Sequence, residues 1–340
     1  MEQLTSEILS IVSLKIGYSA GTNEKVLLPP LNGHANKGEL IAVIGRNGIG
    51  KSTLLRTLTG LQASLGGDIL YSGKGIGSYT RLELARRIGY ISTEIVKVSN
   101  MSVYDLVALG RFPHTNWIGK IDASNHIAIM DAIEKTGMLE FSSRYIYELS
   151  DGERQRAMIA RLLAQDTGIM IMDEPTAFLD IGSKYEILHL MHRLSMDNGK
   201  TIIFSTHDLH MALSQSDKIW LILDNQLAEG APEDLLIKGA FDHLFDSSPG
   251  KFNAEQGTFS FRSEGRGSIY IEGTGPLRHW TEKAVNRAGF SVSKVQTEIY
   301  ITIPQKNNKN WVMKTSAGEK DYDSLYELIR SLNSGSLLAP

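Results

Sequence analysis

The sequence predicts an α/β fold built around a phosphate-binding loop, with a smaller α+β region after it. Residues 45–53 match the pattern G-x-x-x-x-G-K-[ST] at every fixed position. The apolar run 40–44 before this segment predicts a buried strand, and the apolar spacing in 53–58 predicts a helix after it. Two further apolar runs, 169–172 and 201–206, also predict buried strands and lead into acidic or histidine side chains. These features are typical of a parallel sheet whose ligand site lies at the carboxyl ends of the strands.

The composition is that of a globular protein. The chain has 340 residues, 42% hydrophobic and 21% charged, which is enough for one large domain or two ordinary ones. A net charge of −3 gives no overall basic field, so we expect no nucleic-acid partner. The absence of cysteine excludes disulfides and thiolate metal sites. No apolar run approaches the roughly 20 residues of a spanning helix, and the N-terminal residues do not resemble a signal peptide.

The glycine-rich segment is suited to hold phosphate groups. Its glycines let backbone N–H groups turn toward phosphate oxygens, and the N-terminus of the following helix adds partial positive charge. Lys51 can reach the β- and γ-phosphates, and the Ser52 hydroxyl can bind Mg²⁺. A chance glycine-rich turn is the alternative, and the flanking strand and helix argue against it. The predicted phosphate-binding residues are Gly45, Asn47, Gly48, Gly50, Lys51, Ser52 and Thr53.

Acidic and histidine side chains follow the two later buried strands. Asp173 and Glu174 come after 169–172, and His207 comes after 201–206. An acidic pair after a strand is common by chance, but near a phosphate-binding loop it predicts Asp173 as a Mg²⁺ ligand and Glu174 as the group that polarises water. A lone histidine is more often structural, although at this edge of the sheet His207 could contact a γ-phosphate or the water.

Two further places allow both a structural and a functional interpretation. Tyr18 follows the first expected strand, 8–16, where a tyrosine either packs half-buried or stacks on a nucleobase. Ser150 and Glu153 form a capping-box pattern at the start of a helix. On these residues alone an ordinary capped helix is favoured over a second phosphate-binding helix end, at which Gly152 would allow close approach.

The rest of the first 245 residues alternates between expected strands and helices. A helix at 101–110 is predicted to end at Gly110, and 111–117 is expected to be an exposed aromatic and basic loop. A hairpin is expected at 218–230. Further strands are expected at 66–71 and 88–92, and further helices at 81–87, 122–137 and 232–236.

The composition changes after about residue 245. Residues 247–257 are polar and glycine-bearing, which predicts a linker, and beyond it we expect an α+β domain at 257–340. The turn 272–276 could hold an anion, but a plain strand-to-helix turn is favoured. The expected strands of this domain lie at 257–262, 268–272, 295–303 and 311–315, and its helices at 276–288 and 324–332.

In their order along the chain, these motifs resemble those of the ATP-binding cassette (ABC) ATPases. Residues 45–53 are similar to the Walker A motif of that family, 149–153 to its signature, and 169–173 to Walker B. Residues 177–180 resemble its D-loop. The resemblance implies a P-loop NTPase fold over 1–245 that binds and hydrolyses ATP with Mg²⁺, with a helical subdomain at about 95–165.

The resemblance also implies roles for single residues. Glu174 and His207 would be catalytic, and Tyr18 would stack on adenine. Ser52 and Asp173 would hold Mg²⁺. It further implies a homodimer, weakly formed without ATP, in which the signature of one chain acts on the ATP of the other. The residues concerned are Ser150, Gly152 and Glu153 in the signature and Asp180 in the D-loop.

Within the family, residues 109–114 and 152–156 are most similar to the ATPases of iron-siderophore, haem and cobalamin importers. This implies ATP-driven uptake of an iron-chelate type solute through separate polytopic permease subunits, supplied by a solute-binding protein. The chain would then be cytoplasmic and peripheral on the inner face of the cell membrane. The alternative is a soluble ABC ATPase in iron–sulfur assembly or in another role outside transport.

The sequence departs from the family's pattern in two places. Asp151 and Glu153 replace a glycine and a glutamine of the signature, and we expect Glu153 to point toward the helix end, away from the nucleotide. At the Q-loop position the usual glutamine is absent: Thr93 stands there and Glu94 follows, and either the Glu94 carboxylate or a water would take the place on Mg²⁺. The region 257–340 lies outside the resemblance, and a regulatory or dimer-bracing domain is the hypothesis for it.

Overall fold

The structure is a computed structural model that describes residues 7–20, 23–93, 100–116, 119–224, 226–245, 250–253, 258–261, 265–305 and 309–334. Contacts within the chain separate it into two compact units, Met1–Leu244 and Phe245–Pro340. The first unit carries every motif singled out above as a candidate nucleotide site.

The centre of the first unit is a six-stranded sheet in the order β10-β9-β3-β8-β7-β6. Neighbouring strands from β9 to β6 run parallel, and β10 pairs antiparallel with β9. The predicted hairpin and buried strands are therefore confirmed, and all parallel strands end at one edge. The bounds are β3 Leu40–Gly45, β6 Ile88–Ile91, β7 Ile169–Met172, β8 Thr201–Ser205, β9 Lys218–Leu223 and β10 Gln226–Gly230.

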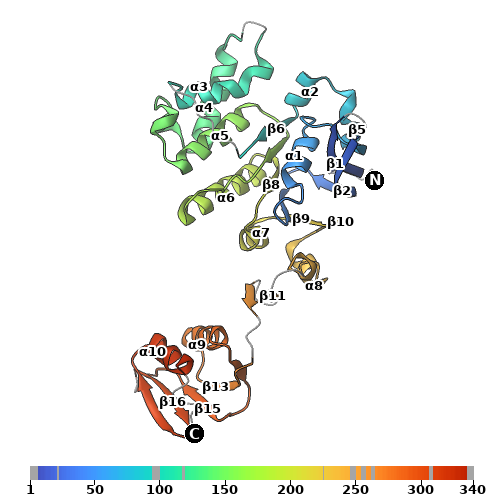
Figure 1. Cartoon of the computed structure of the whole chain (residues 1–340). Helices are drawn as coiled ribbons and strands as arrows, with labels where there is room; N and C mark the ends of the chain where they lie inside the picture. Colours follow the sequence, from blue (N-terminus) through green and yellow to red (C-terminus); the bar gives the residue numbers. More distant parts are fainter. Residues whose placement is uncertain are drawn as a thin grey trace, which may run out of the picture. The chain divides into compact units, whose positions relative to one another are not determined.

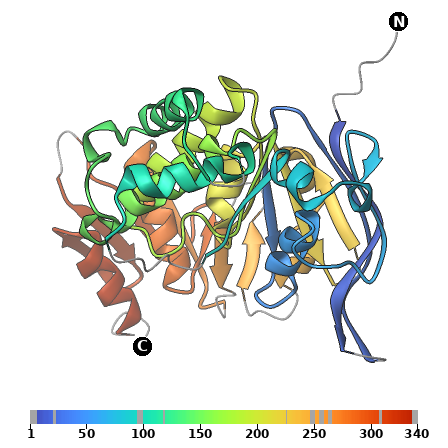
Figure 2. The same ribbon diagram turned by 90° about the horizontal axis from the view of Figure 1, so that it is seen from above.

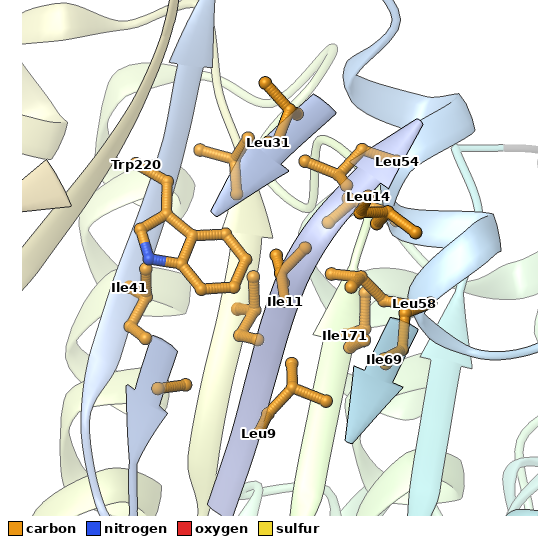
Figure 3. Close-up of a cluster of buried hydrophobic side chains, with 14 of the residues drawn as sticks. Leu9, Ile11, Leu14, Leu31, Ile41, Leu54, Leu58, Ile69, Ile171 and Trp220 are labelled. Carbon is orange, nitrogen blue, oxygen red and sulfur yellow. The ribbon is translucent and has the colours of Figure 1, made fainter. Parts of the chain in front are cut away.

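An antiparallel sheet in the order β2-β1-β4-β5 packs against the central sheet. Its strands are β1 Glu7–Ala20, β2 Asn23–Asn36, β4 Gly66–Tyr71 and β5 Lys74–Gly75. Strand β2 was not predicted from the sequence. It contains Pro29 and Pro30 and lies at the sheet edge, where proline is tolerated. Figure 3 shows Trp220 of β9 and Leu31 of β2 in the core between the sheets, with Leu54 of helix α1 (Lys51–Leu58) nearby.

Helices α3 (Val103–Ala108), α4 (Ala123–Lys135) and α5 (Asp151–Ala164) form a helical part, in which α5 packs against the other two. In Figures 1 and 2 these helices lie on the side of the unit opposite the long β1–β2 ribbon. The predicted end at Gly110 is wrong. Leu109 caps α3, and Gly110 is buried inside the following 3-10 turn η2 (Leu109–His114), where a Cβ atom would lie 2.1 Å from the carbonyl oxygen of Arg161.

The prediction of an exposed loop at 111–117 is also largely wrong. Phe112 is exposed as predicted, but residues up to His114 form η2, and two of its basic side chains point at the end of α5. Arg111 donates to the carbonyl oxygen of Ala164 at 2.8 Å, and His114 Nε2 lies 2.9 Å from that of Gln165. These side chains pair with carbonyls that a helix end leaves unbonded. Trp117 lies outside the described residues.

The other helices of the first unit are α2 (Arg81–Ala85), α6 (Ile181–Met196), α7 (Leu209–Gln215) and α8 (Pro232–Ile237). Short 3-10 turns lie at Ile76–Ser78, Leu139–Phe141, Ile146–Glu148 and Asp242–Phe245. In the described parts of both units, no helix has the length and apolar character needed to cross a membrane.

The second unit is an α+β fold, as predicted. Its five-stranded sheet has the order β14-β13-β15-β16-β17, and a core cluster that includes Val285 of α9 and Leu328 of α10 packs with it. The prediction of a polar linker at 247–257 is wrong for Gly250–Asn253, which form strand β11 and pair with β12 (Thr258–Phe261). Strands β14 and β17 were not predicted either. The remaining bounds are β13 Ser268–Glu272, α9 Pro276–Arg287, β14 Ser291–Ser293, β15 Ile299–Thr302, β16 Trp311–Thr315, β17 Gly318–Tyr322 and α10 Leu325–Asn333.

Candidate nucleotide-binding and catalytic site

The glycine-rich loop leads from the end of β3 into α1. Gly48 has φ +79° and Gly50, which caps α1, has φ +115°, and glycine adopts both at little cost. Lys51 is 7% exposed, and its Nζ donates to the carbonyl oxygens of Gly45 at 2.9 Å and Arg46 at 3.4 Å. Burial lowers the pKa of Lys51, and the negative charges of nearby carboxylates raise it in part. The loop therefore holds a partly desolvated cation at the start of a helix.

Tyr18 lies beside this loop. Its hydroxyl is 3.1 Å from Oγ1 of Thr53 in the first turn of α1, while 51% of the residue stays exposed. A half-exposed ring fixed next to the phosphate loop suits both interpretations offered by the sequence, packing and stacking on a base. Asn47 is exposed in the loop and Ser52 is partly exposed on the first turn of α1, so both are open to a ligand.

Asp173 and Glu174 lie at the carboxyl end of β7, where β8 ends beside them. Asp173 is 2% exposed and accepts a hydrogen bond from Ser205 Oγ at 2.7 Å. The backbone N–H of Glu174 donates to the same Ser205 Oγ at 2.8 Å, and Glu174 has φ +48°. Ser205 thus fixes both acids. Ser205 was not predicted as a site residue; its one signal in the sequence is a hydroxyl at the end of a buried strand.

The two predicted catalytic residues lie close together. Nδ1 of His207 is 3.5 Å from Oε2 of Glu174, because each follows one of the neighbouring strands β7 and β8. His207 is exposed and Glu174 is partly exposed. Both side chains can therefore reach a ligand beyond the carboxyl ends of the strands, whereas the Asp173 side chain is buried.

Ser150 caps α5, and the predicted capping box is present. The Glu153 carboxylate accepts from the backbone N–H of Ser150 at 2.8 Å and from its hydroxyl at 2.9 Å. These bonds lower the pKa of Glu153, and the bond from the backbone N–H has the largest effect. They also turn the carboxylate back toward the end of the helix, as expected. Gly152 is buried, and a Cβ there would lie 2.9 Å from Ser183 Oγ, so packing on α6 within one chain already favours glycine.

Asp180 has a local role as the cap of α6. The Ser183 backbone N–H donates to Asp180 Oδ1 at 3.0 Å, and the Ser183 hydroxyl donates to Oδ2 at 2.8 Å. These bonds lower the pKa of Asp180, with the backbone bond the largest cause. Before it in the chain, Phe178 has φ +63° and is highly exposed. The D-loop therefore presents an aromatic ring outward while its aspartate is held by the helix.

A pocket adjoins Asp173 and Glu174 and is lined on one side by residues of α5. Thr93, Asp173 and Glu174 all line it, so the predicted Q-loop position lies in the same pocket as the two carboxylates. Glu94 lies outside the described residues. Ser150, Gly152 and Glu153 of the signature do not line this pocket. The full lining is Ser92, Thr93, Asp151, Arg154, Gln155, Met158, Asp173, Glu174, Ala177, Phe178 and Leu179.

The oxygen donors at the loop fit Mg²⁺ that arrives with a nucleotide. The described residues contain no group of three or more His, Asp or Glu side chains arranged to hold a metal ion. Asp173 offers a buried carboxylate and Ser52 a hydroxyl, and Mg²⁺ at nucleotide sites usually takes one or two protein oxygens together with phosphates and waters. The donor set therefore suits an ion held mainly by the substrate's phosphates.

Comparison with known proteins agrees with this geometry. Residues 28–177 match the family described as ABC transporter, and residues 266–333 match the Iron ABC transporter C-terminal domain. The chain is 38% identical over 238 residues to the iron(3+)-hydroxamate import ATP-binding protein of Bacillus subtilis strain 168, covering 70% of this chain and 87% of that protein. This chain belongs to the ATP-binding proteins of ABC transporters.

Other similar proteins fall in the same group. The chain is 38% identical to the petrobactin import ATP-binding protein of Bacillus anthracis, covering 63% of this chain and 78% of that one. A solved metal-chelate type ABC transporter in an inward-facing conformation is 28% identical, with a TM-score of 0.61 over 70% of this chain and 89% of that chain. The predicted family and the predicted fold class are confirmed, and the chain is a nucleotide-binding protein of the ABC ATPase family.

Proposed function

We propose that this protein is the ATP-hydrolysing subunit of an importer for an iron-chelate type solute, such as a siderophore, haem or cobalamin. The observation that carries the ATPase part is the pairing of Glu174 with His207 at 3.5 Å, next to the loop that holds Lys51. The solute class is supported by the similar proteins, which are named for import of petrobactin and of iron(3+)-hydroxamate.

Each residue then has a defined task in hydrolysis. The loop N–H groups and Lys51 bind the phosphates, and Tyr18 stacks on adenine. Glu174 orients and polarises the attacking water, while His207 holds the γ-phosphate and that water. Mg²⁺, bound by Asp173 and Ser52 with the phosphates, supplies charge neutralisation. Most of the rate comes from positioning and charge, as in phosphoryl transfer generally.

The working unit is a homodimer. One chain has one phosphate loop and one signature helix end, so each ATP lies between Lys51 of one chain and Ser150 and Gly152 of the other. Residues 1–245 form this ATP-binding domain, with the helical subdomain at about 95–165. Residues 257–340 form an accessory domain that braces the dimer or regulates it, in line with the family match over 266–333.

The partners follow from this role. The dimer binds polytopic permease subunits and, through them, a solute-binding protein, from a peripheral position on the cytoplasmic face of the membrane. ATP closes the dimer, and hydrolysis reopens it. The rival function, a soluble ATPase in iron–sulfur assembly, shares the same ATP chemistry and differs in its partners.

The test uses the full chain with Glu174→Gln, which keeps the shape of the side chain and removes the carboxylate. ATP hydrolysis falls by at least about 100-fold, while the dissociation constant for ATP changes little. Near-normal turnover in this variant would remove Glu174 from the proposed role.

The same variant with ATP bound serves as bait in native membranes. We expect it to copurify a polytopic permease, whose solute would narrow the solute class. Lys51→Ala, which we expect not to bind ATP, is the matched control. Recovery of soluble partners only, with the protein entirely in the cytosolic fraction, would overturn the importer proposal and favour the iron–sulfur assembly role.

A further inference from the structure

The pocket beside Glu174 receives polar side chains from three segments of the first unit. Thr93 comes from the end of β6, Asp173 and Glu174 from the end of β7, and Asp151, Arg154 and Gln155 from the first two turns of α5. The signature helix therefore reaches the catalytic acids of its own chain, although Ser150 at its N-terminus does not line the pocket.

Most of these side chains already have partners. Asp173 accepts from Ser205 at 2.7 Å. Arg154 donates to Asp151 at 2.6 Å and to the carbonyl oxygen of Leu149 at 2.8 Å, so its guanidinium is tied to the start of α5. The half-buried amide of Gln155 forms no hydrogen bond with any of the residues that the structure describes.

We propose that Gln155 is a positioning residue that orients the water activated by Glu174, a role that rests on the proposed ATPase function. A water held in a protein site needs two to four polar partners. Glu174 is an acceptor, and a glutamine amide offers both donors and an acceptor. Thr93, at the place where the family carries glutamine, offers only a hydroxyl on a short side chain. Gln155 supplies a long neutral amide to the same pocket.

The charge of the pocket favours a neutral group at this position. Three carboxylates, Asp151, Asp173 and Glu174, line it together with one cation, Arg154. A fourth carboxylate would repel an approaching triphosphate and the neighbouring acids. An amide binds the water without adding charge, which explains why a glutamine and not a glutamate suits the site.

Gln155 also links the two sites of a dimer. It lies five positions after Ser150 on α5, which is about 7.5 Å along the helix axis. In the proposed homodimer Ser150 contacts the ATP held by the partner. When α5 moves onto that ATP, Gln155 moves in the pocket of its own chain, so closure at one site prepares the other for hydrolysis.

The first experiment measures ATP hydrolysis by the full chain and by Gln155→Ala. We expect kcat to fall about tenfold, with KM for ATP within about twofold, and the Hill coefficient for ATP to approach 1. Gln155→Glu should lose more activity than Gln155→Ala, because it adds the fourth carboxylate. Gln215→Ala, at the end of α7 and outside the pocket, is the matched control and should leave all three values unchanged.

A rescue distinguishes water positioning from a merely structural role. Thr93→Gln adds a long amide at another position of the pocket lining, so the double variant with Gln155→Ala should recover to within about threefold of the wild-type kcat. An unchanged kcat in Gln155→Ala would overturn the proposal. A loss of kcat that is accompanied by a lower melting temperature and is not rescued by Thr93→Gln would overturn it as well. Wild-type protein that hydrolyses no ATP would instead refute the proposed function itself.

Discussion

Two buried lysines at opposite ends of the central strands differ in whether a carboxylate pairs with their charge. Lys218 is the first residue of β9 and is 9% exposed. Its Nζ lies 3.2 Å from Oε2 of Glu39 and donates to the carbonyl oxygen of His34 at 3.1 Å. His34 in turn contacts Glu229 at 2.7 Å, so Lys218 belongs to a network of polar side chains that includes two carboxylates.

Lys51, at the carboxyl edge, is equally buried but is paired differently. Among the residues that the structure describes, its Nζ donates to the two carbonyl oxygens of the loop, and Asp173 and Glu174 act on its charge only from a longer distance. An ammonium group without a carboxylate partner is a costly arrangement that a phosphate group can relieve. This difference supports a structural role for Lys218 and the proposed phosphate-binding role for Lys51.

The acids at the two edges differ in the same way. Glu39 accepts from the backbone N–H and the side-chain amide of Asn36, both at 2.7 Å, in addition to its contact with Lys218. Within the described part of the chain, the one polar contact of the Glu174 carboxylate is with Nδ1 of His207, at 3.5 Å. Filled hydrogen bonds mark the structural acid, and unfilled ones leave Glu174 able to bind water.

The largest effect should come from removing the ligand-facing lysine. Lys51→Met should raise the dissociation constant for ATP by about 100-fold, because the phosphates lose a charge-assisted hydrogen bond. The free energy of unfolding without nucleotide should change by less than about 1 kcal/mol, since no close carboxylate is left unpaired. Titration calorimetry and urea unfolding measure the two values. Unchanged ATP affinity would contradict the comparison.

The matched change at the other edge should have the opposite profile. Lys218→Met leaves Glu39 without its cation, and we expect the free energy of unfolding to fall by about 2 kcal/mol. This value lies between those typical of an exposed and of a fully buried ion pair, because the pair is partly buried. ATP affinity should stay within about twofold. Adding Glu39→Gln to Lys218→Met should recover part of the loss, because the unpaired carboxylate is then removed. A variant that folds normally but fails to bind ATP would contradict the structural role.

The smallest effect concerns pH. Burial alone would raise the pKa of Glu39, but the hydrogen bonds from Asn36 and the charge of Lys218 outweigh it, and the pKa lies below the ordinary value of 4.5. An acid with a lowered pKa stabilises the fold fully above its unfolded value and loses that contribution as the pH falls through the folded one. In Glu39→Gln, the loss of stability between pH 7 and pH 4 should therefore be smaller than in wild type, by no more than about 1 kcal/mol. An identical pH dependence in both proteins, followed by urea unfolding, would count against this network.

Local sequence determined the elements whose signals lie within a few residues. The buried strands β3, β7 and β8, the helix after the glycine-rich loop and the capping box at Ser150 all follow from short patterns of apolar, glycine and capping residues. The order of the motifs was enough to predict the family. The roles of Tyr18, Glu174 and His207 remain predictions that now have a defined geometry.

Tertiary structure alone decided the features that join residues far apart in the chain. Ser205 could be recognised only when β8 lay beside β7, which brings its hydroxyl to Asp173 and Glu174. Glu39 and Lys218 meet because the neighbouring parallel strands β3 and β9 begin at the same end of the sheet. Position 110 favours glycine because the carbonyl oxygen of Arg161, in another helix, leaves no room for a Cβ atom. Sequence patterns report local backbone preference and the apolar face of an element. Which polar atoms then pair depends on strand order and helix packing, and these are set by the burial of the whole core.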